Sequence, residues 1–140
     1  MPILLKAAED KDTDLRANAV LALGTLGDRT IMPTLMSALS DGSSEVRANA
    51  VRALTTLGDR SAVPHLLKVL APLEARELDY WEQEFKIAII RALGELKDTS
   101  ALSSLERALF NSDPEVSLAA RRALNRFDSP EARQLLSGPT

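Results

Sequence analysis

Few side chains in this sequence could carry out catalysis or hold a metal ion. The chain has no cysteine and one histidine, His65, so the usual ligands of a zinc site are missing. Asp10, Asp12 and Asp14 are spaced like calcium ligands, but the glycine and the final glutamate of an EF-hand loop are absent. We therefore interpret these aspartates as helix caps and expect no catalytic residue, no cofactor and no metal site.

Arginines at one repeated position are candidates for binding. Arg52, Arg91 and Arg122 occupy equivalent places in three successive sequence repeats. On stacked helices, their guanidinium groups would form a row about 8–10 Å apart, which suits binding to carboxylates of a partner. The alternative is ordinary solvated charge, because Arg91 can pair with Glu95 one helical turn later.

A cluster of aromatic residues is the second candidate. Tyr80 and Trp81 are the only tyrosine and tryptophan, and Phe85 follows them closely. Many charged residues surround them within residues 71–84, which predicts an exposed extension of the second helix or a helical loop. Exposed Trp and Tyr contribute strongly to interfaces, so we interpret the pair as a binding anchor. The alternative is that Trp81 folds back and covers the neighbouring helix.

A repeat in the sequence must position these side chains. Residues 10–28 read DKDTDLRANAVLALGTLGD, and residues 41–59 read DGSSEVRANAVRALTTLGD. Two more copies follow, and an insertion displaces the third, in which Phe85-Lys86 takes the place of Val46-Arg47. A fixed period of about 30 residues indicates stacked units with one elongated core. We expect one domain over 1–140, with repeats at about 1–28, 29–59, 60–98 and 99–128 and a partial fifth at 129–140.

Each repeat is expected to form two helices. In the second helix, apolar residues recur at i, i+4, i+7, i+8 and i+11, the stripe of a helix packed on one side. These stripes are Leu15, Ala19, Ala22, Leu23 and Leu26; Val46, Ala50, Ala53, Leu54 and Leu57; Phe85, Ile89, Ala92, Leu93 and Leu96; and Val116, Ala120, Ala123, Leu124 and Phe127.

The expected ends of these second helices carry their own signals. N-cap residues are predicted at Asp12, Ser43 and Asp113, and helix stops at Gly27 and Gly58. A carboxylate is predicted in the first turn of each second helix, where it favours the helix dipole. These carboxylates are Asp14, Glu45, Glu84 and Glu115.

The repeats resemble the short HEAT-like repeats, most closely those of phycobilisome (bilin) lyases. The resemblance is carried by Gly58-Asp59-Arg60, Val63-Pro64, Asp41, Val46-Arg47, Ala50 and Ala53-Leu54. It implies an all-α, right-handed α-solenoid of about four two-helix repeats with an insertion in the third.

The resemblance also implies a ladder of aspartates and arginines between neighbouring repeats. Asp10 with Arg16 and Asp41 with Arg47 match it. Lys86 keeps only the charge in the third repeat, and Asn111 and Ser117 replace both members in the fourth. We therefore expect the ladder to weaken towards the C-terminus.

In such a solenoid, the second helices line the concave side. The residues between the apolar stripes then face the groove, and the insertion adds its aromatic pair. The candidate partner-binding residues are Asn18, Asn49, Arg52, Tyr80, Trp81, Ile87, Arg91, Leu118, Arg122 and Arg126.

These observations favour a non-enzymatic, cytoplasmic scaffold that binds a protein partner with an acidic surface on its concave face. The alternatives are a bilin lyase-like subunit or chaperone handling a linear tetrapyrrole, and a designed repeat scaffold. The net charge of −3 disfavours nucleic-acid binding, and no segment reads as a membrane span or signal peptide. Neither end shows a polar cap, which predicts either a fragment of a longer array or end-to-end self-association.

Overall fold

The computed structural model describes residues 2–137 of the chain, and all regular structure within them is helical. The all-α repeat fold expected from the sequence is therefore confirmed. The helices are α1 (Pro2–Ala7), α2 (Thr13–Thr25), α3 (Met32–Ala38), α4 (Ser44–Leu57), α5 (Val63–Glu74), α6 (Tyr80–Leu96), α7 (Leu102–Leu109), α8 (Pro114–Asn125) and α9 (Pro130–Ser137). Short 3-10 turns, η1 (Arg29–Ile31), η2 (Arg60–Ala62) and η3 (Thr99–Ala101), precede α3, α5 and α7.

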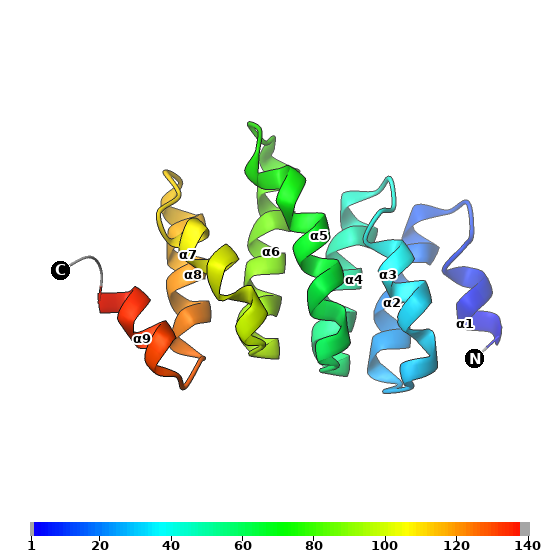
Figure 1. Ribbon diagram of the computed structural model, residues 1–140. Helices are drawn as coiled ribbons and strands as arrows, with labels where there is room; N and C mark the ends of the chain where they lie inside the picture. Colours follow the sequence, from blue (N-terminus) through cyan, green and yellow to red (C-terminus); the bar gives the residue numbers. More distant parts are fainter. Residues whose placement is uncertain (1, 138–140) are drawn as a thin grey trace. The chain divides into compact units, whose positions relative to one another are not determined.

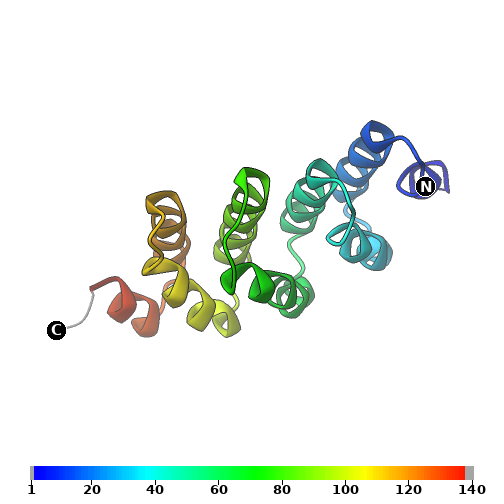
Figure 2. The ribbon, with the colours of Figure 1, turned by 90° about the horizontal axis from the view of Figure 1, so that it is seen from above.

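The chain divides into two compact units. The first unit covers residues 1–62 and contains α1 to α4, drawn in blue to teal in Figure 1. The second unit covers residues 63–140, and its described part contains α5 to α9, drawn in green to red. Within the second unit, α6 and α8 lie side by side in one layer, and α5, α7 and α9 form another (Figure 2).

Side-chain caps explain where the second helices begin. Asp12 accepts hydrogen bonds from the N–H groups of Asp14 and Leu15, and Ser43 accepts one from Val46. Asp113 likewise accepts a hydrogen bond from the N–H of Glu115. These contacts satisfy backbone donors that the first helical turn leaves free, so the three predicted N-caps are confirmed.

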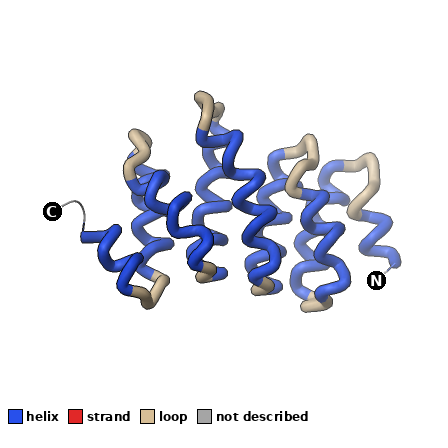
Figure 3. The backbone as a smooth tube through the Cα atoms, viewed as in Figure 1, coloured by secondary structure: helices blue, strands red, loops and turns tan. Residues whose placement is uncertain are grey.

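The helices end in short turns, which Figure 3 shows as tan loops between blue helices. Gly58 caps α4 with a φ of 69°, and Gly27 has a φ of 70° after α2. Glycine adopts this left-handed conformation without steric cost, so both predicted stops are confirmed.

The apolar stripes form the core of each unit. Leu23 and Leu54 in the first unit, and Leu93 and Leu124 in the second, are completely buried. The stripe prediction is wrong at Leu15 of α2 and at Leu26, the C-cap residue of that helix, because their exposed fractions are 43% and 53%. Both residues belong to the first repeat, whose first helix, α1, has only six residues.

A glycine brings the second helices of each unit into close contact. A Cβ atom added to Gly24 of α2 would lie 2.5 Å from the Cβ of Ala53 in α4. A Cβ atom added to Gly94 of α6 would lie 2.6 Å from both the Cα and the Cβ of Ala123 in α8. These separations are shorter than van der Waals contact. The two helix pairs can therefore pack this closely only with glycine, which has no side chain, at these positions.

The insertion in the third repeat lengthens both helices of that repeat. Helix α5 has 12 residues, whereas α3 has 7 and α7 has 8. Helix α6 has 17 residues and starts at Tyr80, after a capping box between Asp79 and Glu82. Glu84 therefore lies in the second turn of α6, and its predicted place in the first turn is wrong.

Candidate functional site

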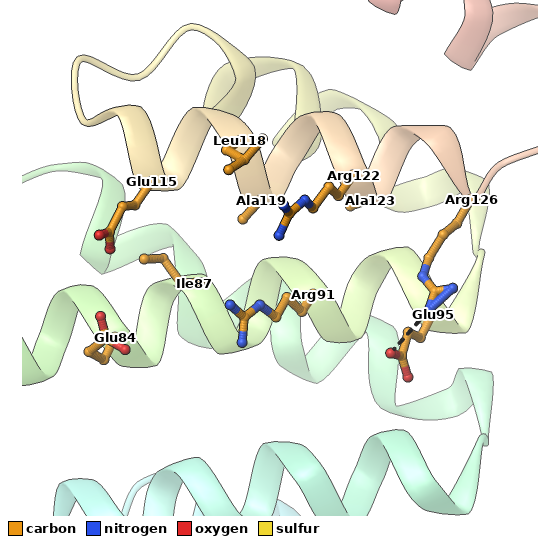
Figure 4. A pocket seen from close by; sticks show the side chains of 10 residues that line it. All are labelled: Glu84, Ile87, Arg91, Glu95, Glu115, Leu118, Ala119, Arg122, Ala123 and Arg126. Atoms are coloured by element: carbon orange, nitrogen blue, oxygen red, sulfur yellow. Dashed lines mark hydrogen bonds and ion pairs between the residues drawn. The ribbon is translucent and has the colours of Figure 1, made fainter.

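A groove of about 450 Å³ runs between α6 and α8 in the second unit. We call it the α6–α8 groove, and Figure 4 shows the side chains that line it. The lining residues of α8 that carry long side chains each lie one repeat after their counterpart in α6. Together they form four rungs: Glu84/Glu115, Ile87/Leu118, Arg91/Arg122 and Glu95/Arg126.

Helix periodicity places these rungs on one surface. Glu84, Ile87, Arg91 and Glu95 are spaced by three or four residues, so they lie along one face of α6. The same spacing recurs from Glu115 of α8 to Arg126, the C-cap residue of that helix. Ala119 and Ala123 also line the groove, and both are buried.

The Arg91/Arg122 rung brings two cations together without partners. Both side chains are exposed, and neither makes a hydrogen bond or an ion pair with any of the described residues. The alternative in which Arg91 pairs with Glu95 is wrong. Glu95 instead accepts from Arg126 of the neighbouring helix, with 3.4 Å between Oε1 and Nη2, as the dashed line in Figure 4 marks.

The Glu84/Glu115 rung brings two anions together at the other end of the groove. Both residues are exposed. Among residues 2–137, no hydrogen bond or ion pair is formed by either carboxylate. The groove therefore presents an acidic rung and a basic rung that are both open to a ligand.

An apolar rung separates these charges. Leu118 is 46% exposed, whereas Ile87 is only 5% exposed and forms part of the groove floor. Ile87 therefore lines the groove as predicted, but as a buried residue of its floor and not as an exposed one. Leu118 is the side chain of this rung that a partner would contact most.

Asn49 was predicted to face the groove, and this orientation is wrong. Asn49 is 9% exposed, and its Nδ2 donates to the carbonyl oxygen of Ala17 in α2, at 2.9 Å. A position three residues after the start of the stripe lies about 80° from its centre, because each residue turns an α-helix by about 100°. In α4 that position faces α2, whereas the outward Arg52 lies farther round the helix and is exposed.

Asn18 and Arg52, the other candidates on the second helices of the first unit, are both exposed. They belong to α2 and α4, and neither lines the α6–α8 groove. The structure brings together five of the predicted residues in that groove: Ile87, Arg91, Leu118, Arg122 and Arg126.

The aromatic pair begins α6 and is open to solvent. Tyr80 is 67% exposed and Trp81 is 62% exposed, with ring centroids 5.0 Å apart in an edge-to-face arrangement. The alternative in which Trp81 covers a neighbouring helix is therefore wrong. Tyr80 lies one turn before Glu84, and both residues line a second cavity of about 880 Å³ together with Glu115.

The first unit contains the Asp–Arg ladder that the family resemblance implies. Arg16 forms a bidentate ion pair with Asp41 of the next repeat, with Nε–Oδ2 and Nη2–Oδ1 distances of 3.0 Å. Partial burial acts to raise the pKa of Asp41, but hydrogen bonds from Arg16 and from the Ser43 N–H outweigh it and lower that pKa. The ladder joins neighbouring repeats of the first unit, as the family resemblance implied.

In the second unit, other contacts replace this ladder. Gln83 of α6 donates to Asp113, and Ser117 donates to the carbonyl oxygen of Leu109 at 2.7 Å. The N–H of Glu115 and the Gln83 side chain lower the pKa of Asp113. Lys86 is buried nearby, being 5% exposed. The predicted loss of the Asp–Arg pair is confirmed, and hydrogen bonds donated by the uncharged side chains of Gln83 and Ser117 take its place.

The described residues were also searched for a metal-ion site and for a membrane-spanning helix. Among them, no group of three or more histidine, aspartate or glutamate side chains could hold a metal ion. Within residues 2–137, no helix combines the length and the apolar character that crossing a bilayer requires.

The sequence and the structure both resemble known helical-repeat proteins. The family model for HEAT repeats matches residues 1–81 and 71–138. A search of the curated proteins finds no significant match. Among solved structures, similarity is found to a chain of the complex of CpcE and CpcF of phycocyanin lyase from Nostoc sp. PCC7120, at 29% identity and a TM-score of 0.72. The match covers 94% of this chain and 54% of the lyase chain, so this chain spans about half of that protein's length.

An engineered protein with a crystal structure is also similar. It shares 21% identity with this chain, and the TM-score is 0.57. The match covers 96% of this chain and 65% of the engineered one. At this identity, the likeness concerns the fold alone.

Proposed function

This chain belongs to the HEAT-repeat family, and we propose that it is a non-catalytic scaffold that binds an acidic segment of a partner protein in the α6–α8 groove. The unpaired Arg91/Arg122 rung carries this proposal. Two guanidinium groups without carboxylate partners repel one another, and a bound carboxylate would relieve that repulsion. Arginine also binds carboxylates through two parallel hydrogen bonds, which adds geometric selectivity.

The exposed aromatic pair supports the same location. Tyr80 lies one turn before Glu84 on the groove face of α6, and Trp81 packs edge-on against it. Residues of this kind often dominate the binding energy of interfaces. We propose Trp81 as an apolar anchor at the end of the groove, with Leu118 as a second apolar contact.

A charge-reversal experiment tests this proposal. The ligand is a labelled, alanine-based helical peptide with the pattern Glu-x-x-Leu-x-x-x-Glu, and binding is followed by fluorescence anisotropy and NMR titration. The R91E/R122E variant should lose binding. The R60E/R121E variant reverses two exposed arginines outside the groove and serves as the matched control, so it should retain binding. Binding should also weaken with added salt. Equal binding by the two variants would refute the proposed site.

The similarity to a phycocyanin lyase chain supports a second candidate function. In that role the chain would act together with a second chain on a linear tetrapyrrole. The test is incubation of the purified chain with a bilin, with and without a lyase partner subunit, followed by absorption and fluorescence spectroscopy. A bilin that co-purifies with the chain and shows a shifted spectrum would support this role. An unchanged bilin spectrum in both mixtures would count against it.

A further inference from the structure

The Glu84/Glu115 rung indicates what else the bound segment must carry. Resting on the proposed function of the groove, we propose that the segment is an amphipathic helix with a basic residue at position i, an apolar residue at i+3 and an acidic residue at i+7. The basic residue lies between Glu84 and Glu115, the apolar residue contacts Leu118, and the acidic residue lies between Arg91 and Arg122.

Helix capping does not account for Glu84. The N-terminus of α6 already has a capping box, in which the Asp79 side chain accepts from the Glu82 N–H and the Glu82 side chain accepts from the Asp79 N–H. Glu84 lies in the turn after this box, where the helix dipole favours a carboxylate much less. It faces Glu115 across the groove, and neither carboxylate has a cation among the described residues. A ligand cation at this rung would satisfy both groups.

Tyr80 adds a second feature that favours a cation. It lines the cavity that also contains Glu84 and Glu115, and its ring is largely exposed. The face of an aromatic ring attracts lysine and arginine side chains. A basic side chain at this rung would therefore have two carboxylates and an aromatic ring within reach, whereas an acidic side chain would meet two like charges.

The distance between the acidic and the basic rung favours a helical conformation for the bound segment. Glu84 and Arg91 are seven residues apart, which is about 10 Å along α6 at 1.5 Å per residue. A helix lying along the groove repeats this spacing with its own residues i, i+3 and i+7, all on one face. An extended strand would cover the distance in about three residues at 3.3 Å each, and its first and last side chains would point to opposite faces.

Three peptides of matched helicity distinguish this inference from the proposed function alone. All three peptides have Leu at position i+3. They differ at positions i and i+7, which are Lys and Glu in the Lys/Glu peptide, Glu at both in the Glu/Glu peptide, and Lys at both in the Lys/Lys peptide. Binding to the full chain is measured by anisotropy and by NMR titration up to millimolar concentration. If only the arginines act, the Glu/Glu peptide binds at least as tightly as the Lys/Glu peptide. The further inference instead expects the Lys/Glu peptide to bind about three- to tenfold more tightly than either other peptide.

Two variants locate the preference. E84Q/E115Q should abolish the preference of Lys/Glu over Glu/Glu, while R91Q/R122Q should weaken binding of both these peptides. E9Q/E106Q removes two exposed carboxylates outside the groove and should keep the wild-type preference. Equal or tighter binding of Glu/Glu to the wild type, with dependence on the arginines, overturns this inference and leaves the proposed function standing. A preference that survives in E84Q/E115Q overturns it as well. Absence of any arginine-dependent binding overturns both proposals.

Discussion

The first unit pairs α2 with α4, the second pairs α6 with α8, and the two pairs share a packing device. In each pair a glycine of one helix lies against an alanine of the next repeat, Gly24 against Ala53 and Gly94 against Ala123. The contacts between the helices differ around this shared point. The first unit uses the Arg16–Asp41 pair and the buried hydrogen bond of Asn49, whereas the second uses Gln83 with Asp113.

The outer faces of the two pairs differ more than their packing. The positions in the first unit that correspond to the four rungs are Asp14/Glu45, Ala17/Ala48, Leu21/Arg52 and Thr25/Thr56. Asp14/Glu45 corresponds to the acidic rung, but Leu21/Arg52 has only one arginine. Thr25/Thr56 replaces the ion pair between Glu95 and Arg126. The comparison shows that the buried face of a repeat meets one packing requirement, while its exposed face can vary. The groove chemistry consequently belongs to the second unit.

The largest effect is expected from a core position that both units contain. Leu54→Ala and Leu93→Ala each remove a completely buried side chain. Each should lower the free energy of unfolding by about 2–5 kcal/mol, through lost apolar burial and a residual cavity. Urea denaturation followed by circular dichroism measures this loss. A loss below about 1 kcal/mol for either variant would show that its unit is packed in a different register.

The glycine contacts test whether the two helix pairs are packed equivalently. In Gly24→Ala and Gly94→Ala the added methyl group overlaps an alanine backbone, which should cost more than the gain of about 1 kcal/mol in helix propensity. Each variant should therefore be destabilised, by up to about 2 kcal/mol. Gly42→Ala is the control, since a Cβ at Gly42 has no neighbour within 4 Å. Thermal melts of the three variants should separate Gly42→Ala from the other two, and a stabilised Gly24 or Gly94 variant would disprove the tight contact.

The Arg16–Asp41 pair should make the first unit sensitive to acid. The folded state lowers the pKa of Asp41, so its stabilisation is present above the unfolded-state pKa of about 4 and is lost as the pH falls through the folded-state pKa. Asp41→Asn should lower the free energy of unfolding by about 1–2 kcal/mol at pH 7. The difference from the wild type should shrink below about pH 4. A difference that stays constant from pH 7 to pH 3 would exclude the ionised pair as its cause.

The smallest effect is expected from the charged rungs of the groove. E84Q/E115Q and R91Q/R122Q each remove two exposed, unpaired like charges. Each should change the free energy of unfolding by less than about 0.5 kcal/mol. The loss of like-charge repulsion should stabilise R91Q/R122Q, whereas in E84Q/E115Q it is offset by the lost interaction of Glu115 with the dipole of α8. Urea denaturation at low salt measures the change. A clear destabilisation would show that these side chains support the fold, which would weaken their assignment to binding.

The helical repeat and much of its local detail follow from the pattern of residues along the chain. The period of the repeat, the caps at Asp12, Ser43 and Asp113, and the turns at Gly27 and Gly58 could all be predicted, because each depends on the pattern of residues along the chain or on neighbours within one or two turns. The repeated place of Arg91 and Arg122 could be predicted for the same reason. Their binding role stays a prediction.

Which side chains meet across helices depends on how the helices pack. Asn49 points inward and donates a hydrogen bond to Ala17. Glu95 pairs with Arg126 and not with Arg91. Helix α6 begins at Tyr80, earlier than predicted, and Glu84 lies opposite Glu115. Sequence periodicity defines the face of a single helix to within part of a turn. The distance and angle between helices of successive repeats depend instead on the small residues where they touch and on the length of each helix, and these decide which charges find a partner and which remain free for a ligand.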